Sequence, residues 1–376
     1  MVRSMLWGAV FKYRTLCVVF LLAVVPCQSN STNDPDTSRV EQQAKRAEAA
    51  GNTSAALSLY AQALKKLPAW TDGWWQYGGL LYESHRFTEA AQAFGRLTRL
   101  APDNPLGFAL LGLCEYEKGE WSNARLHLAK ALASRPRMPP DILHAAAFHL
   151  GLVHLHTRET DHALLVFENL YRQAPEYPGL SVALGSAELR LEAVPETTSP
   201  LFPAVELASQ AALAVLEDRK NDAGKAYRAL LLQFPSQPFV HLGYGILLVK
   251  QNRDDEAAEE FRAETALNPE SAEPWIWLAR MALERSDAEE AREDATKARA
   301  LDPVDGLSYY IEGRSFILLH QWDNALGALG EAERRAPDNA EVHFSLVSVY
   351  VAMQRADDAA RERKLFLQAS KSADAP

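Results

Sequence analysis

The sequence contains little cysteine and no apolar run as long as the roughly 20 residues of a membrane-spanning helix. Its three cysteines are Cys17, Cys27 and Cys114. The first two lie in or beside the apolar run near the N-terminus, so a chain cleaved after Cys27 cannot form an internal disulfide. Cys114 then stands alone inside the apolar segment LGFALLGLCEY. We expect it to be a small buried side chain rather than a reactive thiol.

Basic residues are outnumbered by acidic ones. Lys and Arg total 39 against 49 for Asp and Glu, which gives a formal net charge of -10 over 376 residues. Binding to a phosphate backbone needs clustered cations, so we expect no nucleic-acid partner. With 48% hydrophobic and 23% charged residues, the chain has the composition of a folded protein.

The sequence also lacks the short motifs of common catalytic sites. HExxH, G-x-S-x-G, the P-loop, G-x-G-x-x-G and C-x-x-C are all absent from it. We therefore expect no enzyme and no cofactor.

One segment is rich in histidine, HAAAFHLGLVHLHTRETDH, which contains His144, His149, His154, His156 and His162. His149 and His156 are seven residues apart and share a helix face. Seven residues span about 10.5 Å of helix, which is too far for one metal ion without a third ligand. We therefore expect no metal site, and we interpret these histidines as surface or groove residues.

The apolar run LCVVFLLAVV at residues 16–25 follows Arg3, Lys12 and Arg14 and precedes the polar stretch PCQSNSTNDPD. This order is typical of an export signal, which we place at 1–29, with a polar linker at 30–36. Ten apolar residues are too few for a spanning helix, which needs about 20. We expect a periplasmic or otherwise extracytoplasmic protein.

Two alternatives for the N-terminus stay open. VVPC resembles a lipobox, which would make Cys27 the lipid-bearing first residue of a membrane-anchored lipoprotein, although Pro26 stands where that motif has a small residue. The run could also remain as an uncleaved anchor.

A proline recurs along the chain at a regular interval. Prolines stand at 68, 102, 136, 175, 235, 269, 303 and 337, and five of the seven steps between them are 34. Twelve residues before each proline stands an alanine: Ala56, Ala90, Ala124, Ala163, Ala223, Ala257, Ala291 and Ala325. Twenty-four residues before each stands a glycine or alanine: Ala44, Gly78, Gly112, Gly151, Ala211, Gly245, Ala279 and Gly313. Eight residues before, five of the eight positions are aromatic: Tyr60, Phe94, Phe167, Tyr227 and Phe261.

These spacings predict a helical hairpin in each repeat. Each repeat holds two apolar stretches of helical period, such as DGWWQYGGLLYES and TEAAQAFGRLTRLA, joined by a short polar turn. We expect the two helices to approach closest at the small residues, the glycine or alanine of the first helix and the alanine of the second. The aromatic residue lies one turn further and fills the seam towards a neighbouring hairpin. The proline ends the second helix.

The pattern resembles the tetratricopeptide repeat family. Trp74, Gly78, Ala90, Phe94 and Pro102 stand in the register of the family's signature, and a later repeat with Trp275, Leu278, Ala279, Ala291, Ala298 and Pro303 matches likewise. The resemblance covers about residues 37–370 and implies an all-α fold, an α-solenoid of stacked antiparallel hairpins in a right-handed superhelix. Glu264 and Glu312 depart from it, since they replace small or apolar residues.

We count four full repeats and a lone helix at 178–193 in a first block, 37–193, and five repeats in a second block, 204–373, before a tail at 374–376. The segment VPETTSPLFP at 194–203 carries three prolines where a second helix should begin. Two interpretations stay open: the lone helix caps the first block and 194–203 is a hinge, or that helix packs against the next repeat.

In the resembled family the first helices line a concave groove that binds protein segments. Residues seven apart on these helices share a face, which predicts an apolar and aromatic groove. We assign to it Trp75, Tyr82, Ala109, Tyr116, Phe148, Phe239, Ile246, Trp277, Tyr310, Ile317 and Phe344. We also assign His149 and His156 to this groove. Arg280 and Arg314 stand one repeat period apart, so we expect them side by side, either gripping a carboxylate or paired with Glu273, Glu284 or Glu312. The family's Lys and Asn set for a chaperone C-terminus is missing.

The expected function is that of a non-enzymatic exported scaffold that binds one or more proteins, as in envelope, secretion or pilus assembly. Two alternatives remain: a carrier of a small molecule, glycan or haem in the aromatic groove, and an accessory protein with a metal site at His149 and His156. We expect a monomer that meets a membrane only through its signal or a lipid on Cys27.

Overall fold

The computed structural model describes residues 35–133 and 138–373. The predicted signal peptide, Cys27, residues 30–34 of the predicted linker and the tail at 374–376 lie outside these ranges. Residues 35 and 36, which we assigned to the linker, are helical, because α2 begins at Pro35. In the part of the chain that the structure describes, no helix is long and apolar enough to cross a membrane.

The described residues fold into α-helices that form two compact units, divided between Asp218 and Arg219. The helices of the N-terminal unit are α2 (Pro35–Ala49), α3 (Thr53–Lys66), α4 (Thr71–Glu83), α5 (Phe87–Leu100), α6 (Pro105–Glu117), α7 (Trp121–Leu132), α8 (Pro140–His156), α9 (Thr160–Gln173), α10 (Leu180–Glu188) and α11 (Phe202–Leu216). Those of the C-terminal unit are α12 (Lys220–Gln233), α13 (Val240–Val249), α14 (Asp254–Leu267), α15 (Glu273–Glu284), α16 (Ala288–Leu301), α17 (Gly306–Leu318), α18 (Trp322–Arg335), α19 (Ala340–Ala352) and α20 (Ala356–Ala373).

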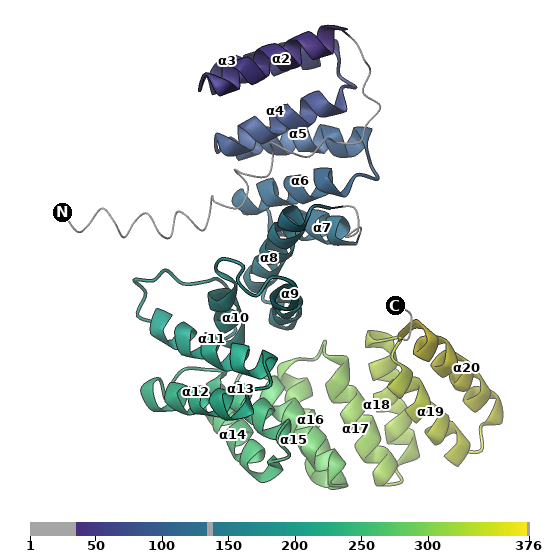
Figure 1. Cartoon of the computed structure of the whole chain (residues 1–376). Helices are drawn as coiled ribbons and strands as arrows, with labels where there is room; N and C mark the ends of the chain where they lie inside the picture. Colours follow the sequence, from purple (N-terminus) through teal and green to yellow (C-terminus); the bar gives the residue numbers. More distant parts are fainter. Residues whose placement is uncertain (1–34, 134–137, 374–376) are drawn as a thin grey trace. The chain divides into compact units, whose positions relative to one another are not determined.

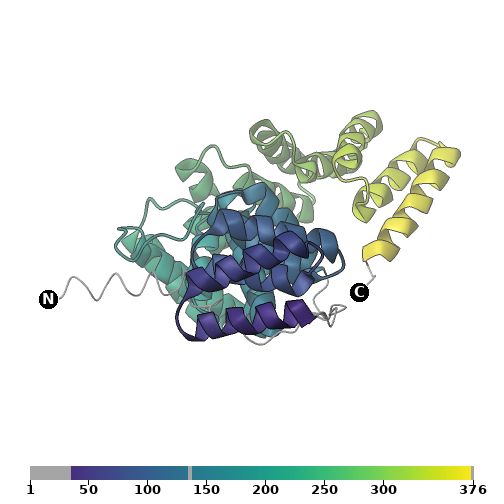
Figure 2. The same cartoon turned by 90° about the horizontal axis from the view of Figure 1, so that it is seen from above.

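Consecutive helices pack as antiparallel hairpins, which confirms the predicted α-solenoid. Figure 1 shows the hairpins α2–α3, α4–α5 and α6–α7 in successive layers, and the view from above in Figure 2 shows the first of these layers overlying the later ones. First helices of neighbouring hairpins are also in contact with one another. Helix α6 contacts α8, and α15 contacts α17. Helices α8 and α10, and α17 and α19, are also in contact, so first helices line up side by side from α6 to α10 and from α15 to α19.

The prolines end the second helices as predicted. Each of α3, α5, α9, α12, α14, α16 and α18 stops two residues before its proline. The residue between has a non-helical backbone, as at Ala101 with φ -132° and ψ 72°. A following proline disfavours the helical region for the residue before it, so the helix ends there.

The glycines of the first helices make room for a large side chain of their own hairpin. A Cβ on Gly78 would lie 2.8 Å from Phe94, one on Gly151 2.2 Å from Phe167, and one on Gly245 2.5 Å from Phe261. Leu128 and Leu329 take the same place against Gly112 and Gly313. The close approach is thus confirmed, but the aromatic residue packs on the glycine of its own hairpin, whereas we predicted that it fills the seam towards a neighbouring hairpin.

The predicted alanines form the buried core beside these contacts. Ala90, Ala124, Ala163, Ala257, Ala291 and Ala325 have no exposed surface. Cys114 is buried and free, and burial raises the pKa of its thiol. The prediction of a small core side chain is therefore confirmed at Cys114.

The proline-rich segment separates two helices that pack together. Helix α10 ends at Glu188, earlier than the predicted 193, and α11 begins at Phe202. The two helices are in contact, and a Cβ on Gly185 would lie 2.3 Å from both Ser209 Oγ and the Val205 carbonyl oxygen. The lone helix thus packs against the following helix, and the division between compact units falls after Asp218 instead of at 194–203.

Candidate protein-binding site

Four predicted groove residues belong to the core. The exposed fractions of Trp75, Tyr82, Ala109 and Tyr310 are only 1%, 8%, 0% and 9%. Trp75 meets Phe94 edge to face at 6.3 Å between ring centroids, and Tyr82 meets Phe87 at 5.2 Å. These side chains fill the space between helices, so the prediction that they line an open groove is wrong.

The remaining aromatic residues of the C-terminal unit are partly accessible and lie in different repeats. Phe239 does not lie in a helix, because it precedes α13 with a φ of 69°. Trp277 stacks on Phe261 of the preceding hairpin at 5.6 Å. Phe344 on α19 is 57% exposed and lies 5.7 Å from Phe366 of α20. Trp277 and Phe344 thus each pack on a ring of a second helix, instead of extending an aromatic face along the first helices.

Arg280 and Arg314 each contact an aromatic ring of their own helix. The Arg280 guanidinium lies 4.6 Å from the Trp277 ring centroid. Arg314 donates a hydrogen bond to the Tyr310 hydroxyl at 2.9 Å. Glu312, one expected partner, lies 3.4 Å from Arg299 instead. The structure therefore gives each arginine a local aromatic partner in place of the expected ion pairs.

The structure brings four predicted groove residues together in the N-terminal unit. Tyr116 of α6 and Phe148, His149 and His156 of α8 form one band of rings, which also includes Trp121 of α7 and Tyr177 of the α9–α10 connection. We call these six residues the aromatic–histidine surface. All six are half-buried, so each ring is held by the fold while part of it faces solvent.

Tyr116 is the centre of this surface. Its ring lies 4.8 Å from His149, 5.3 Å from Trp121 and 6.2 Å from His156. Phe148 continues the band at 5.7 Å from His149 and 5.1 Å from Tyr177. Because α6 and α8 are neighbouring first helices, the band crosses from one hairpin to the next. The prediction that His149 and His156 share a face is confirmed.

The two histidines favour the neutral form. Burial lowers the pKa of His149, opposed by the hydrogen bond between its Nδ1 and the Ala145 carbonyl oxygen at 2.8 Å. Burial also lowers the pKa of His156, and Glu192 opposes it. The surface is thus uncharged at neutral pH, and it offers flat rings with polar edges.

Trp121 and Tyr177 were missed because they lie outside the first helices. Trp121 is the first residue of α7, and Phe87 and Trp322 begin α5 and α18. A ring at this position contacts the last turn of the first helix in the same hairpin, as the Phe87 ring contacts Tyr82. The recurrence of Phe87 and Trp121 at a spacing of 34 was a signal that could have identified this position.

A protein-family model described as tetratricopeptide repeat matches residues 42–105, 78–139, 210–272, 245–306 and 311–372. The chain belongs to the tetratricopeptide repeat family. The matched ranges stop at 139 and resume at 210, so the aromatic–histidine surface lies partly in the stretch that this repeat model does not match.

Three individual proteins are also similar to parts of this chain. Anaphase-promoting complex subunit 3 of Schizosaccharomyces pombe is 32% identical over 114 residues, which is 30% of this chain and 17% of that protein. MamA of Desulfovibrio magneticus RS-1 is 16% identical with a TM-score of 0.42, over 45% of this chain and 96% of its own. A tetratricopeptide repeat protein of Parabacteroides merdae is 12% identical with a TM-score of 0.36, and the match covers 75% of this chain and 100% of that protein's chain. The chain thus spans under a fifth of the length of its curated relative.

Other histidines of this tetratricopeptide repeat protein are bound to carboxylates. His154 Nδ1 lies 2.6 Å from Glu159 Oε2, and His162 stacks on His154, so these three residues could approach a metal ion. However, Glu159 also pairs with Arg125, whose positive charge opposes a cation there. The sequence had singled out His149 and His156 for a metal, and neither is in this cluster.

A second cluster joins Glu333, His343 and Glu362 in the C-terminal unit. His343 Nδ1 lies 2.9 Å from Glu362, and its Nε2 lies 2.7 Å from the Pro337 carbonyl oxygen. Since hydrogen bonds occupy both ring nitrogens, neither is available to a metal ion. His343 instead ties α19 to α20.

Proposed function

We propose that this protein is an exported, non-enzymatic scaffold that binds an extended or helical segment of another protein on the aromatic–histidine surface. The tetratricopeptide repeat fold is typical of proteins that bind other proteins. The observation that carries the proposal is the continuous band from Trp121 through Tyr116 to Phe148, which crosses two neighbouring first helices.

The chemistry of this surface suits a protein partner. Rigid, partly exposed rings bury much apolar area on binding at little cost in side-chain entropy, and aromatic residues dominate binding energy at interfaces. The neutral histidines add hydrogen-bonding edges without a charge that would have to be desolvated. A segment with apolar anchors one helical turn apart would match the band.

The cellular setting of the proposal rests on the N-terminal sequence. Basic residues, ten apolar residues and a polar stretch at 1–36 support export, so we place the partner outside the cytoplasm, as in an envelope, secretion or pilus assembly. We propose that the protein acts as a monomer. The mass of the mature protein from fractionated cells tests export: loss of the segment 1–29 supports it, and an added diacylglycerol on Cys27 would make it a lipoprotein. A full-length cytoplasmic protein would contradict it.

Site-specific photocrosslinking in the native cell tests the binding surface. A photoreactive amino acid in place of His156 should capture a specific extracytoplasmic protein, and capture should decrease at least tenfold in a His149→Ala background. The matched control places the same group at Phe344, an exposed aromatic residue on a first helix of the C-terminal unit. Capture at Phe344 but not at His156 would move the site to the other unit and overturn the proposal.

A further inference from the structure

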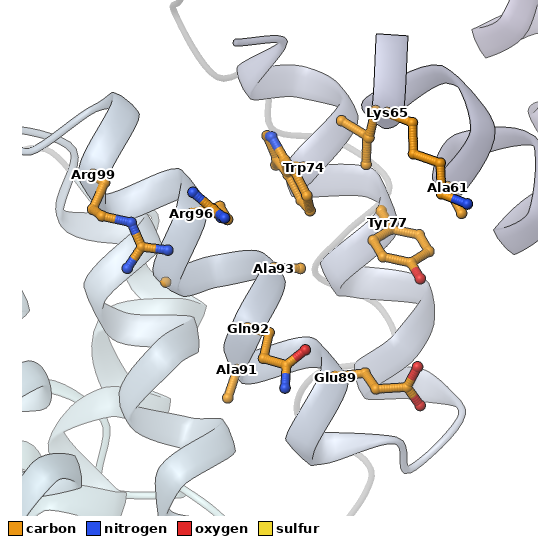
Figure 3. Close-up of a pocket in the computed structure, with 12 residues that line it drawn as sticks. Ala61, Lys65, Trp74, Tyr77, Glu89, Ala91, Gln92, Ala93, Arg96 and Arg99 are labelled. Atoms are coloured by element: carbon orange, nitrogen blue, oxygen red, sulfur yellow. The ribbon is translucent and has the colours of Figure 1, made fainter. Parts of the chain in front are cut away.

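A groove separate from the aromatic–histidine surface lies between the second helices α3 and α5. It has a volume of about 610 Å³, within the range of sites that hold small ligands or short segments of chain. Figure 3 shows Trp74 and Tyr77 of α4 side by side between α3, which carries Lys65, and α5, which carries Arg96 and Arg99. The groove therefore has an aromatic floor and walls that carry cations.

Small residues keep the groove open. Ala61 and Gly95 occupy the same place in consecutive repeats, since they are one repeat period apart, and both line the groove. The nearest atom to a Cβ on Gly95 would be the Arg99 guanidinium nitrogen at 4.0 Å. A larger side chain at Gly95 would thus enter the groove without displacing the backbone.

The three cations of the groove are not neutralised by the protein. Within residues 35–133 and 138–373, no carboxylate forms an ion pair with Lys65, Arg96 or Arg99. The one acidic residue of the lining, Glu89, accepts two hydrogen bonds from Arg86 at 2.7 and 2.6 Å. The groove is thus a basic site on a chain whose net charge is -10.

The α17–α18 hairpin shows how the same position is neutralised elsewhere. Arg334 is equivalent to Arg99, and it pairs with Glu331 three residues earlier. The residue equivalent to Glu331 in the second repeat is Arg96. Two like charges three residues apart repel each other, so α5 keeps an uncompensated positive charge that α18 does not have.

Trp74 also differs from its equivalents in other repeats. Lys130 lies 3.9 Å from the Phe108 ring centroid and Lys297 lies 4.2 Å from that of Trp275, and these pairs are equivalent to Arg96 and Trp74. No cation covers Trp74 in the ranges that the structure describes. Its indole Nε1 donates to the Pro68 carbonyl oxygen at 2.9 Å, which fixes the ring. The face that a lysine covers elsewhere is left for a ligand.

We propose that this groove binds an acidic peptide segment of a partner protein. An apolar or aromatic side chain of the segment packs on Trp74 and Tyr77, and its carboxylates accept hydrogen bonds from Lys65, Arg96 and Arg99. Charge-assisted bonds to arginine and stacking on a fixed indole are both strong relative to other surface contacts. The site goes beyond the proposed function, because it lies between the second helices α3 and α5 and shares no residue with the aromatic–histidine surface.

Fluorescence polarisation with the full chain tests the site. The probe is a labelled six-residue peptide of one Phe and five Asp or Glu residues, and the comparison peptide carries Asn and Gln in place of the acids. We expect the acidic peptide to bind at least tenfold more tightly than its amide counterpart, and less tightly as salt is raised. Binding should weaken about tenfold in Arg99→Gln and in Gly95→Leu, which fills the groove.

The α17–α18 hairpin supplies matched controls at equivalent positions, Arg334→Gln and Gly330→Leu, which should bind the peptide normally. Equal loss in the controls, no binding of the acidic peptide, or equal binding of the amide peptide would overturn the proposal. Competition by inorganic phosphate or by single-stranded DNA at lower concentration than the peptide would also overturn it. Photocrosslinking at His156 should be unchanged in Arg99→Gln, so the two sites can fail independently.

Discussion

Trp121 and His156 stack face to face, with ring centroids 4.1 Å apart and an angle of 13° between the ring planes. Trp121 begins the second helix of one hairpin, and His156 ends the first helix of the next. The stack therefore links consecutive repeats. It holds one end of the aromatic–histidine surface in a fixed geometry, so a partner would meet rings that are already ordered.

His149 should make the stability of the protein depend on pH. Because burial places the pKa of His149 below the ordinary value of 6.5, the unfolded chain binds a proton before the folded chain does as pH falls. The contribution of His149 to the free energy of unfolding is therefore largest above about pH 6.5 and decreases as the pH falls below that value. Thermal midpoints followed by circular dichroism between pH 8 and 5 should fall less steeply for His149→Gln than for the unmodified protein. The exposed His320 provides the control His320→Gln, and equal slopes for all three proteins would contradict the prediction.

Gly151 should not tolerate a methyl group. A Cβ there would lie 2.2 Å from the Phe167 ring, so Gly151→Ala should lower the free energy of unfolding by about 1–3 kcal/mol through overpacking. A Cβ on Gly330 in α18 would have no atom within 4 Å, and Gly330→Ala should raise stability by about 0.5–1 kcal/mol through helix propensity. Urea unfolding measures both, and the same sign for the two variants would contradict the packing argument.

Glu264 should be a stabilising cap, although the repeat pattern favours a small or apolar residue at this position. Its buried carboxylate accepts hydrogen bonds from the backbone N–H groups of Phe239 at 2.8 Å and Leu242 at 3.3 Å, at the start of α13. Glu264→Ala would leave these donors unsatisfied and should cost about 1–3 kcal/mol of unfolding free energy. Glu259→Ala, an exposed change on the same helix, should cost under about 0.5 kcal/mol. Comparable losses in urea unfolding would show that the capping bonds contribute little.

The connection between α10 and α11 should be cut first by a protease specific for glutamate. Glu192 and Glu196 lie in this exposed, non-helical segment, and such loops are the usual sites of limited cleavage. Since α10 packs against α11, the nicked protein should elute as one species and separate only in denaturant. If this loop resists cleavage as well as the hairpins do, 194–203 is not a hinge. If the fragments separate without denaturant, the α10–α11 contact is weak.

The repeat pattern could be recognised in the sequence because it depends on the chemistry of residues close together in the chain. A proline disfavours a helical backbone at the residue before it wherever it stands, and a small residue such as Gly78 is needed where a ring such as Phe94 crosses close to the first helix. The hairpins, their bounds near each proline and the buried alanines therefore follow from spacing alone. The sequence could not show that α10 would pack against α11 across the proline-rich segment, because that contact joins residues on either side of a long connection.

Which side chains line a binding surface depends on how each helix is rotated about its own axis, and the spacing of residues does not specify that rotation. Trp74 and Trp75 are adjacent, and a helix turns by about 100° per residue, so one indole lines a groove while the other is buried against Phe94. By itself the sequence determined the hairpin and its period, because these follow from backbone sterics and from the size of side chains. Only the tertiary structure decided which rings meet solvent, because exposure depends on the residues that neighbouring hairpins bring to the same place.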